Sequence, residues 1–144
     1  MPKKTLKVSL NRKSGDFHFE ALGASKIAVD IDSGISLGGT NLGASPMELL
    51  LMGVGGCSAI DVILILKKSK QQIDDIKITV TGERDTDAIP APFEKIHLEF
   101  VLFGDVKKQK AEEAIRLSME KYCSAAVMLS KTAEITWSCR IDNS

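Results

Sequence analysis

The stretch that decides the fold runs from Ser45 to Val62 and reads SPMELLLMGVGGCSAIDV. Ser45 suits the N-cap of a helix, Pro46 suits its first turn, and Glu48 can return a hydrogen bond to the Ser45 amide. The apolar residues that follow cover nearly all faces of a helix. This pattern predicts a central, buried helix that is interrupted at its glycines and resumes to about Lys70.

Three of these glycines, Gly53, Gly55 and Gly56, fall within four positions directly before Cys57. Each interior glycine costs a helix about 1 kcal/mol relative to alanine, so a compensating reason is expected. One reason is close packing against another helix, and another is a kink that gives access to the Cys57 sulfur. If the helix restarts there, free amides and the positive end of its dipole would stabilise a Cys57 thiolate.

A second cysteine, Cys123, ends a charged amphipathic helix that is predicted over residues 106–122. It lies 66 positions beyond Cys57. Since both adjoin a helix irregularity, they are candidates for a peroxidatic and resolving pair that cycles through a disulfide. The alternative is that both are small core residues, because a free cysteine packs as a small hydrophobe. Cys139, on the apolar face of the last predicted strand, is assigned to the core.

The charges near Cys57 leave its reactivity open. Asp61 lies one helical turn beyond Cys57, at i+4, and therefore on the same face. A carboxylate there disfavours a thiolate unless a cation intervenes. Glu48 either completes the helix cap or orients an arginine beside Cys57. Each of the four arginines is a candidate for that cation: Arg12, Arg84, Arg116 and Arg140.

Alternation of apolar and polar residues predicts six strands. They fall at residues 6–10, 17–21, 27–31, 76–80, 96–102 and 133–141. The first three form a meander, the next two form a hairpin across a proline-containing loop at 85–92, and a short helix at 124–131 precedes the last. The order βββαββααβ predicts an α+β fold, antiparallel sheet packed on two central helices, in a single domain over residues 1–144. The glycine-rich residues 33–45 are expected to be a flexible connector, since a phosphate-binding loop would carry a lysine.

Composition narrows the function. Lys plus Arg and Asp plus Glu each number 19, so the chain lacks the basic excess that draws proteins to nucleic acid or an anionic membrane. The N-terminus lacks the apolar stretch of a signal peptide, and the longest apolar run, residues 60–66, is too short to span a bilayer. With three cysteines and no export signal, a cytoplasmic protein with free thiols is expected.

A metal or cofactor is not expected from the sequence. It has no CxxC or HxxxH spacing, and His18 and His97 fall on predicted strands among alternating residues. They are interpreted as sheet-face histidines rather than ligands.

The segment Ser45–Val62, with GGCSAID inside it, resembles the first-cysteine helix of the OsmC/Ohr family, and Tyr122-Cys123-Ser124 resembles its second-cysteine motif. The GGCSAID and EKYCS motifs, together with Gly82-Glu83-Arg84 ahead of a proline loop, are most similar to the YhfA-like branch. The resemblance implies an interlaced homodimer, with helices between wrapping sheets, that reduces organic hydroperoxides.

The same resemblance implies residue roles. Cys57 would attack the peroxide and form a sulfenic acid, Cys123 would capture it as a disulfide, and an external dithiol would reduce the bridge. Glu48 matches the glutamate that pairs with an N-terminal arginine over the reactive thiol in the family, and Arg12 is the candidate for that arginine.

Two functions stay open. The first is a thiol-dependent hydroperoxide reductase in oxidative-stress defence, and the second is a non-catalytic, redox-sensing or small-ligand-binding dimer with structural cysteines. A Cys57 thiolate within reach of Arg12 or Arg84 favours the first, whereas a neutral, dry thiol beside an unpaired Asp61 favours the second. In either case, so much apolar helix with only one Trp and one Tyr predicts a homodimer.

Overall fold

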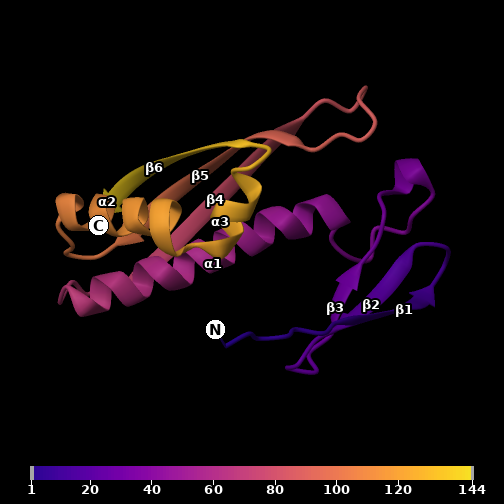
Figure 1. Cartoon of the computed structure of the whole chain (residues 1–144), viewed down its shortest axis with the longest axis horizontal. Helices are drawn as coiled ribbons and strands as arrows, with labels where there is room; N and C mark the ends of the chain where they lie inside the picture. Colours follow the sequence, from indigo (N-terminus) through magenta and orange to yellow (C-terminus); the bar gives the residue numbers. More distant parts are fainter. Residues whose placement is uncertain (1, 144) are drawn as a thin grey trace. The chain divides into compact units, whose positions relative to one another are not determined.

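The computed structural model describes residues 2–143 (Figure 1). The chain forms two compact units, Met1–Leu50 and Leu51–Ser144, and each is described by itself below. The helices and strands follow the predicted order, with one additional short 3₁₀ helix, and together make an α+β fold.

The N-terminal unit contains the predicted three-stranded meander. Its strands are β1 (Ser9–Ser14), β2 (His18–Leu22) and β3 (Val29–Ile31), in the order β1-β2-β3. Both pairings are antiparallel, as short strands joined by tight connections allow. His18 begins β2, where it is buried and hydrogen-bonds Ser14 and Asp30.

The glycine-rich segment after β3 is anchored rather than a flexible connector. Asp32 is only 2% exposed, and its carboxylate accepts hydrogen bonds from the Thr40 hydroxyl at 2.5 Å and from the amides of Ser33 and Leu42. The hydrogen bond from the Thr40 hydroxyl is the main cause that lowers the pKa of Asp32, to about 2. Burial opposes this shift, and the backbone amides add to it. A 3₁₀ helix, Ile35–Leu37, occupies the middle of the segment.

Helix α1 (Pro46–Lys68) begins with the predicted capping box. The Ser45 amide donates to Glu48 Oε1 at 2.9 Å, and the Glu48 amide donates to Ser45 Oγ at 3.4 Å. The helix then runs without a break through its three glycines, so the predicted interruption there is wrong. Gly55 has a packing reason instead, because a Cβ at that position would come within 3.0 Å of a Val80 methyl group.

Helix α1 is longer and more apolar than the run counted from the sequence. Its 18-residue window has a mean hydropathy of 2.3, so α1 could cross a membrane by length and composition alone. The core helix of a soluble protein passes the same test, and α1 carries Asp61 near its middle. Among its apolar residues, Ile60 and Leu64 are exposed by 61% and 52%.

The sheet of the C-terminal unit is mixed rather than wholly antiparallel. It contains β4 (Asp75–Arg84), β5 (Phe93–Phe103) and β6 (Glu134–Asp142), in the order β4-β5-β6. Strands β4 and β5 form the predicted hairpin, but β6 pairs with β5 in parallel. Parallel pairing follows from the connection, because the chain must cross back through α2 (Lys108–Leu117) and α3 (Ser124–Leu129) before β6 begins.

The core of this unit lies between the sheet and its helices. Figure 1 shows α2, α3 and the part of α1 in this unit on the same side of the sheet. The central strand β5 alternates as predicted and contributes four fully buried residues: Ile96, Leu98, Phe100 and Leu102. On its other face, His97 hydrogen-bonds the hydroxyls of Thr136 and Ser138 on β6, so it is a sheet-face histidine.

Gly43 tests the anchoring of the N-terminal unit. A Cβ there would overlap the Asp30 carbonyl and lie 2.7 Å from the Ile31 amide nitrogen. We expect Gly43→Ala to lower the free energy of unfolding by about 1–3 kcal/mol, as overpacking does, measured by urea denaturation. Gly34→Ala is the matched control, because no atom lies within 4 Å of a Cβ there. Equal stability of the two variants would contradict the packing described.

Candidate thiol redox site

Three side chains from distant parts of the sequence meet in the C-terminal unit. Cys57 and Asp61 lie on α1, and Cys123 lies between α2 and α3. Both Sγ atoms and an Asp61 carboxylate oxygen all lie within 4.8 Å of one another. The structure thus brings the two cysteines together with the acid at i+4, and we call this group the Cys57–Asp61–Cys123 cluster.

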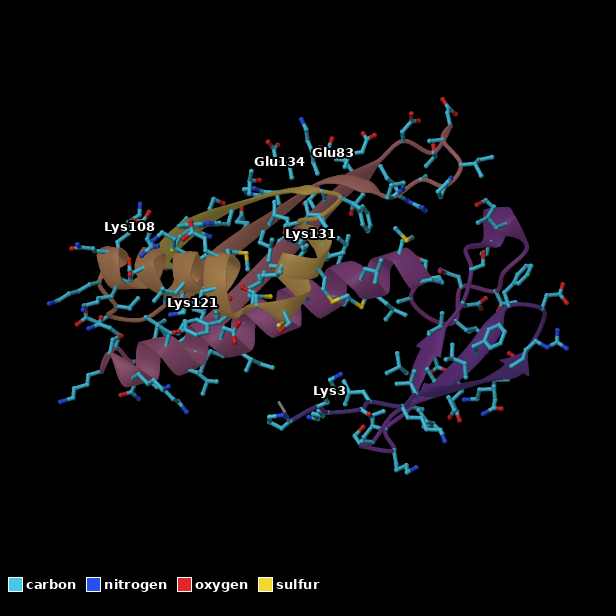
Figure 2. The ribbon with its side chains drawn as sticks, viewed as in Figure 1. Lys3, Glu83, Lys108, Lys121, Lys131 and Glu134 are labelled. Carbon is cyan, nitrogen blue, oxygen red and sulfur yellow. The ribbon has the colours of Figure 1, made fainter. Side chains whose placement is uncertain are left out.

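A π-helical turn places Cys123. Helix α2 ends at Leu117 and continues as a π-helical turn, Ser118–Tyr122, in which Figure 2 labels Lys121. The Cys123 amide donates to the Ser118 carbonyl at 2.7 Å, the i+5 pairing that defines this turn. Cys123 then adopts an extended conformation and caps α3, where its Sγ accepts from the Ala126 amide at 3.3 Å. The predicted helix irregularity therefore exists at Cys123, whereas α1 is regular at Cys57.

The environment of Cys123 keeps its thiol protonated near neutral pH. Burial raises the pKa of Cys123 to about 11, against the opposing effect of the Ala126 amide. The Cys57 thiol and the Asp61 charge contribute smaller parts of this same upward shift in pKa. Cys57 itself is half-buried, so it is the more accessible of the two sulfurs.

Two buried serines belong to the site and were missed from the sequence. The Ser118 hydroxyl lies 3.2 Å from Asp61 Oδ2, to which it donates, and 3.3 Å from the Ser58 hydroxyl. Both serines are fully buried, and Ser118 occupies a position that the helical pattern assigns to the apolar stripe. Asp61 is the one signal in the sequence that could have indicated them, because a carboxylate in an apolar helix needs a hydrogen-bond donor nearby.

Asp61 forms no ion pair with the described residues. Across residues 2–143, neither a lysine nor an arginine nor a histidine forms an ion pair with it. It lines a cavity of about 350 Å³ together with Leu64, Ile65, Lys68, Leu117 and Tyr122. The cluster thus holds a half-buried carboxylate beside two thiols, and this carboxylate lines the cavity.

The other predicted site residues, Arg12 and Glu48, belong to the N-terminal unit. Arg12 is exposed on β1, opposite Phe19 of β2. Glu48 accepts hydrogen bonds from the amide and the hydroxyl of Ser45, and these bonds lower the pKa of its carboxyl. Glu48 therefore completes the capping box, and its pairing with Arg12 over Cys57 stays a prediction.

The remaining arginines have partners of their own. Arg84 donates to the Ala91 carbonyl at 3.2 Å in the loop between β4 and β5. Arg116 pairs with Glu113 and Glu120, and Arg140 lies 3.7 Å from Asp142.

Cys139 lies on β6, outside the cluster. It is half-buried rather than a fully buried core residue. Burial, followed by the charge of Glu112, raises the pKa of its thiol, and Lys108 opposes the shift.

The chain belongs to a known family with this fold. Residues 39–138 match the family described as OsmC-like protein, so the chain is a member of it. It is similar to Protein YhfA of Escherichia coli strain K12, with 47% identity over 98 residues that cover 67% of this chain and 72% of that protein. The family resemblance and its YhfA-like branch are therefore confirmed.

Solved structures agree on the fold. A hypothetical protein from Aquifex aeolicus VF5 superposes with a TM-score of 0.82 at 32% identity, covering 98% of this chain and 100% of that one. A Legionella pneumophila structure, described as an organic hydroperoxide resistance protein OsmC and predicted redox protein, gives a TM-score of 0.75 at 13% identity. It covers 97% and 99% of the two chains, and at this identity it shows the shared fold alone.

The raised pKa of Cys123 predicts a loss of stability at high pH. The folded state holds this proton more tightly than the ordinary cysteine value of 9.0, so the stabilisation is complete below about pH 9 and is lost towards pH 11. We expect the free energy of unfolding to fall more steeply over this window in wild type than in Cys123→Ser, measured by urea denaturation under reducing conditions. Cys139→Ser is the control for loss of a half-buried thiol elsewhere. Parallel pH profiles for wild type and Cys123→Ser would contradict the assignment.

Proposed function

We propose that this protein is a thiol-dependent reductase of organic hydroperoxides and that Cys57 and Cys123 are its redox pair. The observation that carries the proposal is the approach of the two sulfurs to within 4.8 Å. A disulfide needs a separation of about 2.05 Å, so oxidation requires a local movement of side chains rather than a refolding of elements. The description of the Legionella protein supports hydroperoxides as the substrate class.

The proposed reaction uses both thiols in sequence. The Cys57 thiolate attacks the terminal oxygen of the O–O bond, which breaks to leave Cys57 as a sulfenic acid and to release an alkoxide that takes a proton from solvent to become the alcohol. Cys123 then attacks that sulfur, the hydroxide leaves with a proton as water, and the disulfide forms. Two cysteine thiols are thereby oxidised while ROOH becomes ROH and water. An external dithiol reduces the bridge and restores both thiols.

Accessibility and proton transfer distinguish the two roles. Cys57 is half-buried and suits the first attack, whereas Cys123 is buried and holds its proton up to about pH 11. The Asp61 carboxylate lies within 4.8 Å of the Cys123 sulfur, and through one bridging water or a small side-chain rotation it would accept that proton as the second attack begins. Arg12, paired with Glu48, is proposed as the cation that activates Cys57.

Substitution of single cysteines tests this reaction. Cys57→Ser should abolish turnover of an organic hydroperoxide, because a serine hydroxyl is scarcely ionised near neutral pH. Cys123→Ser should permit one turnover and leave Cys57 as a sulfenic acid that over-oxidises. Cys139→Ser is the matched control and should keep wild-type turnover, measured as peroxide consumed per subunit with a dithiol reductant. Equal activity of wild type and Cys57→Ser would exclude a reductase that depends on the Cys57 thiol.

A second candidate function rests on Asp61. A carboxylate without an ion pair among residues 2–143, beside two thiols, suits a redox sensor or small-ligand-binding protein whose thiols stay protonated. Iodoacetamide labelling of Cys57 at increasing pH, followed by mass spectrometry, separates the two functions. Rapid labelling at neutral pH supports the reductase, whereas labelling only at alkaline pH supports the non-catalytic protein with structural cysteines.

The proposed enzyme is cytoplasmic, because a reducing compartment keeps its thiols free. It is also proposed to be a homodimer whose subunits associate through α1. Ile60 and Leu64 are large apolar side chains that α1 leaves exposed, and such a surface marks an interaction site. We expect light scattering at micromolar concentration to give twice the chain mass of 15.6 kDa. Ile60→Glu should shift the protein towards monomer, and Lys67→Glu, an exposed change on the same helix, should not. A monomeric wild type would exclude the dimer.

A further inference from the structure

We propose that the Cys57–Asp61–Cys123 cluster is also a binding site for a thiophilic divalent cation, with Zn²⁺ as the reference ion. This inference goes beyond peroxide reduction and does not require it. It rests on the donor set, on its spacing and on the charge of the group.

The spacing of the donor atoms fits a tetrahedral ion. With Zn–S distances of about 2.3 Å and a Zn–O distance of about 2.1 Å, the donors of a tetrahedral site stand about 3.5–3.8 Å apart. The two sulfurs and the Asp61 oxygen already lie within 4.8 Å of one another. Small rotations of these side chains would close the site around one ion. Three protein ligands leave the fourth position for water or a small ligand.

The donor chemistry selects the kind of ion. Two cysteine sulfurs favour zinc and other thiophilic metals over Mg²⁺ or Ca²⁺, which prefer all-oxygen sites. The carboxylate adds a negative charge that pairs with no lysine, arginine or histidine among residues 2–143, and a divalent cation would compensate it. The Ser118 hydroxyl, 3.2 Å from Asp61 Oδ2, is an outer partner of the kind that orients ligating carboxylates.

A route to the site is present. Asp61 lines the cavity of about 350 Å³ and is half-buried, so an ion can reach its carboxylate before the buried Cys123. The sequence gives no sign of this site, because its ligands lie at i, i+4 and 66 positions beyond the first. Helix α1 supplies two donors, and the end of the π-helical turn supplies the third.

Metal binding and the disulfide exclude each other, because each requires both sulfurs. If the proposed reductase activity is also correct, a bound ion blocks the peroxide reaction reversibly until a chelator removes it. The occupied site would also shield Cys57 and Cys123 from alkylation while leaving Cys139 unaffected.

Cobalt titration of the fully reduced full-length protein tests the site without any activity assay. We expect one Co²⁺ per subunit, a thiolate-to-cobalt charge-transfer band, and displacement of Co²⁺ by Zn²⁺. Cys57→Ser and Cys123→Ser should each lose most of the charge-transfer intensity, and Asp61→Asn should weaken binding at least tenfold. Cys139→Ser and Asp105→Asn, an exposed acid in the same unit, are the matched controls and should bind as wild type does. Circular dichroism confirms that each variant is folded.

The proposal is overturned if wild type binds cobalt without the charge-transfer band. It is also overturned if folded Asp61→Asn and Cys123→Ser bind as tightly as wild type. Binding by a protein without peroxide turnover would reject the reductase and keep the metal site. Turnover by a protein that fails to bind Co²⁺ or Zn²⁺ would reject the metal site and keep the reductase. Failure of the metal site and failure of the reductase are therefore distinguishable.

Discussion

The hydrogen bond from the Cys123 amide to the Ser118 carbonyl, 2.7 Å long, is the interaction on which the site depends. It closes a π-helical turn, adds one residue to the last turn of the helix and ends it at Cys123. Because the chain then leaves the helix in an extended conformation, the Cys123 sulfur caps α3 and meets Cys57 and Asp61 of α1. The same turn carries Ser118, whose hydroxyl holds the Asp61 carboxylate.

Local signals in the sequence predicted most of the elements. The capping box at Ser45 and Glu48 and the alternation along β5 each involve residues close in the sequence, so both elements can be predicted from local sequence. The reason for a glycine at position 55 of α1 could not be predicted in this way, since it lies in a methyl group of Val80 on β4 that leaves little room for a Cβ. The parallel pairing of β6 likewise depends on where two helices return the chain.

The part of the site that depends on local sequence was predicted. The i+4 relation of Cys57 and Asp61 follows from helical periodicity, but the burial of Ser58 and Ser118 beside them requires the packing of the π-helical turn against α1. A serine in an apolar stripe has no distinctive pattern of its own. The Asp61 carboxylate is the group in this packing that both proposals use. Beside two thiols, it would accept a proton in the redox cycle or bind a cation as a ligand.

Cys57 and Cys123 of one subunit are proposed to form a redox pair. Peptide mapping by mass spectrometry, after treatment of the reduced protein with one equivalent of an organic hydroperoxide, tests it most directly. We expect a Cys57–Cys123 disulfide within one chain and a Cys139 thiol that is still free. A Cys57–Cys139 bridge, bridges only between subunits, or two fully alkylatable thiols at Cys57 and Cys123 would contradict it.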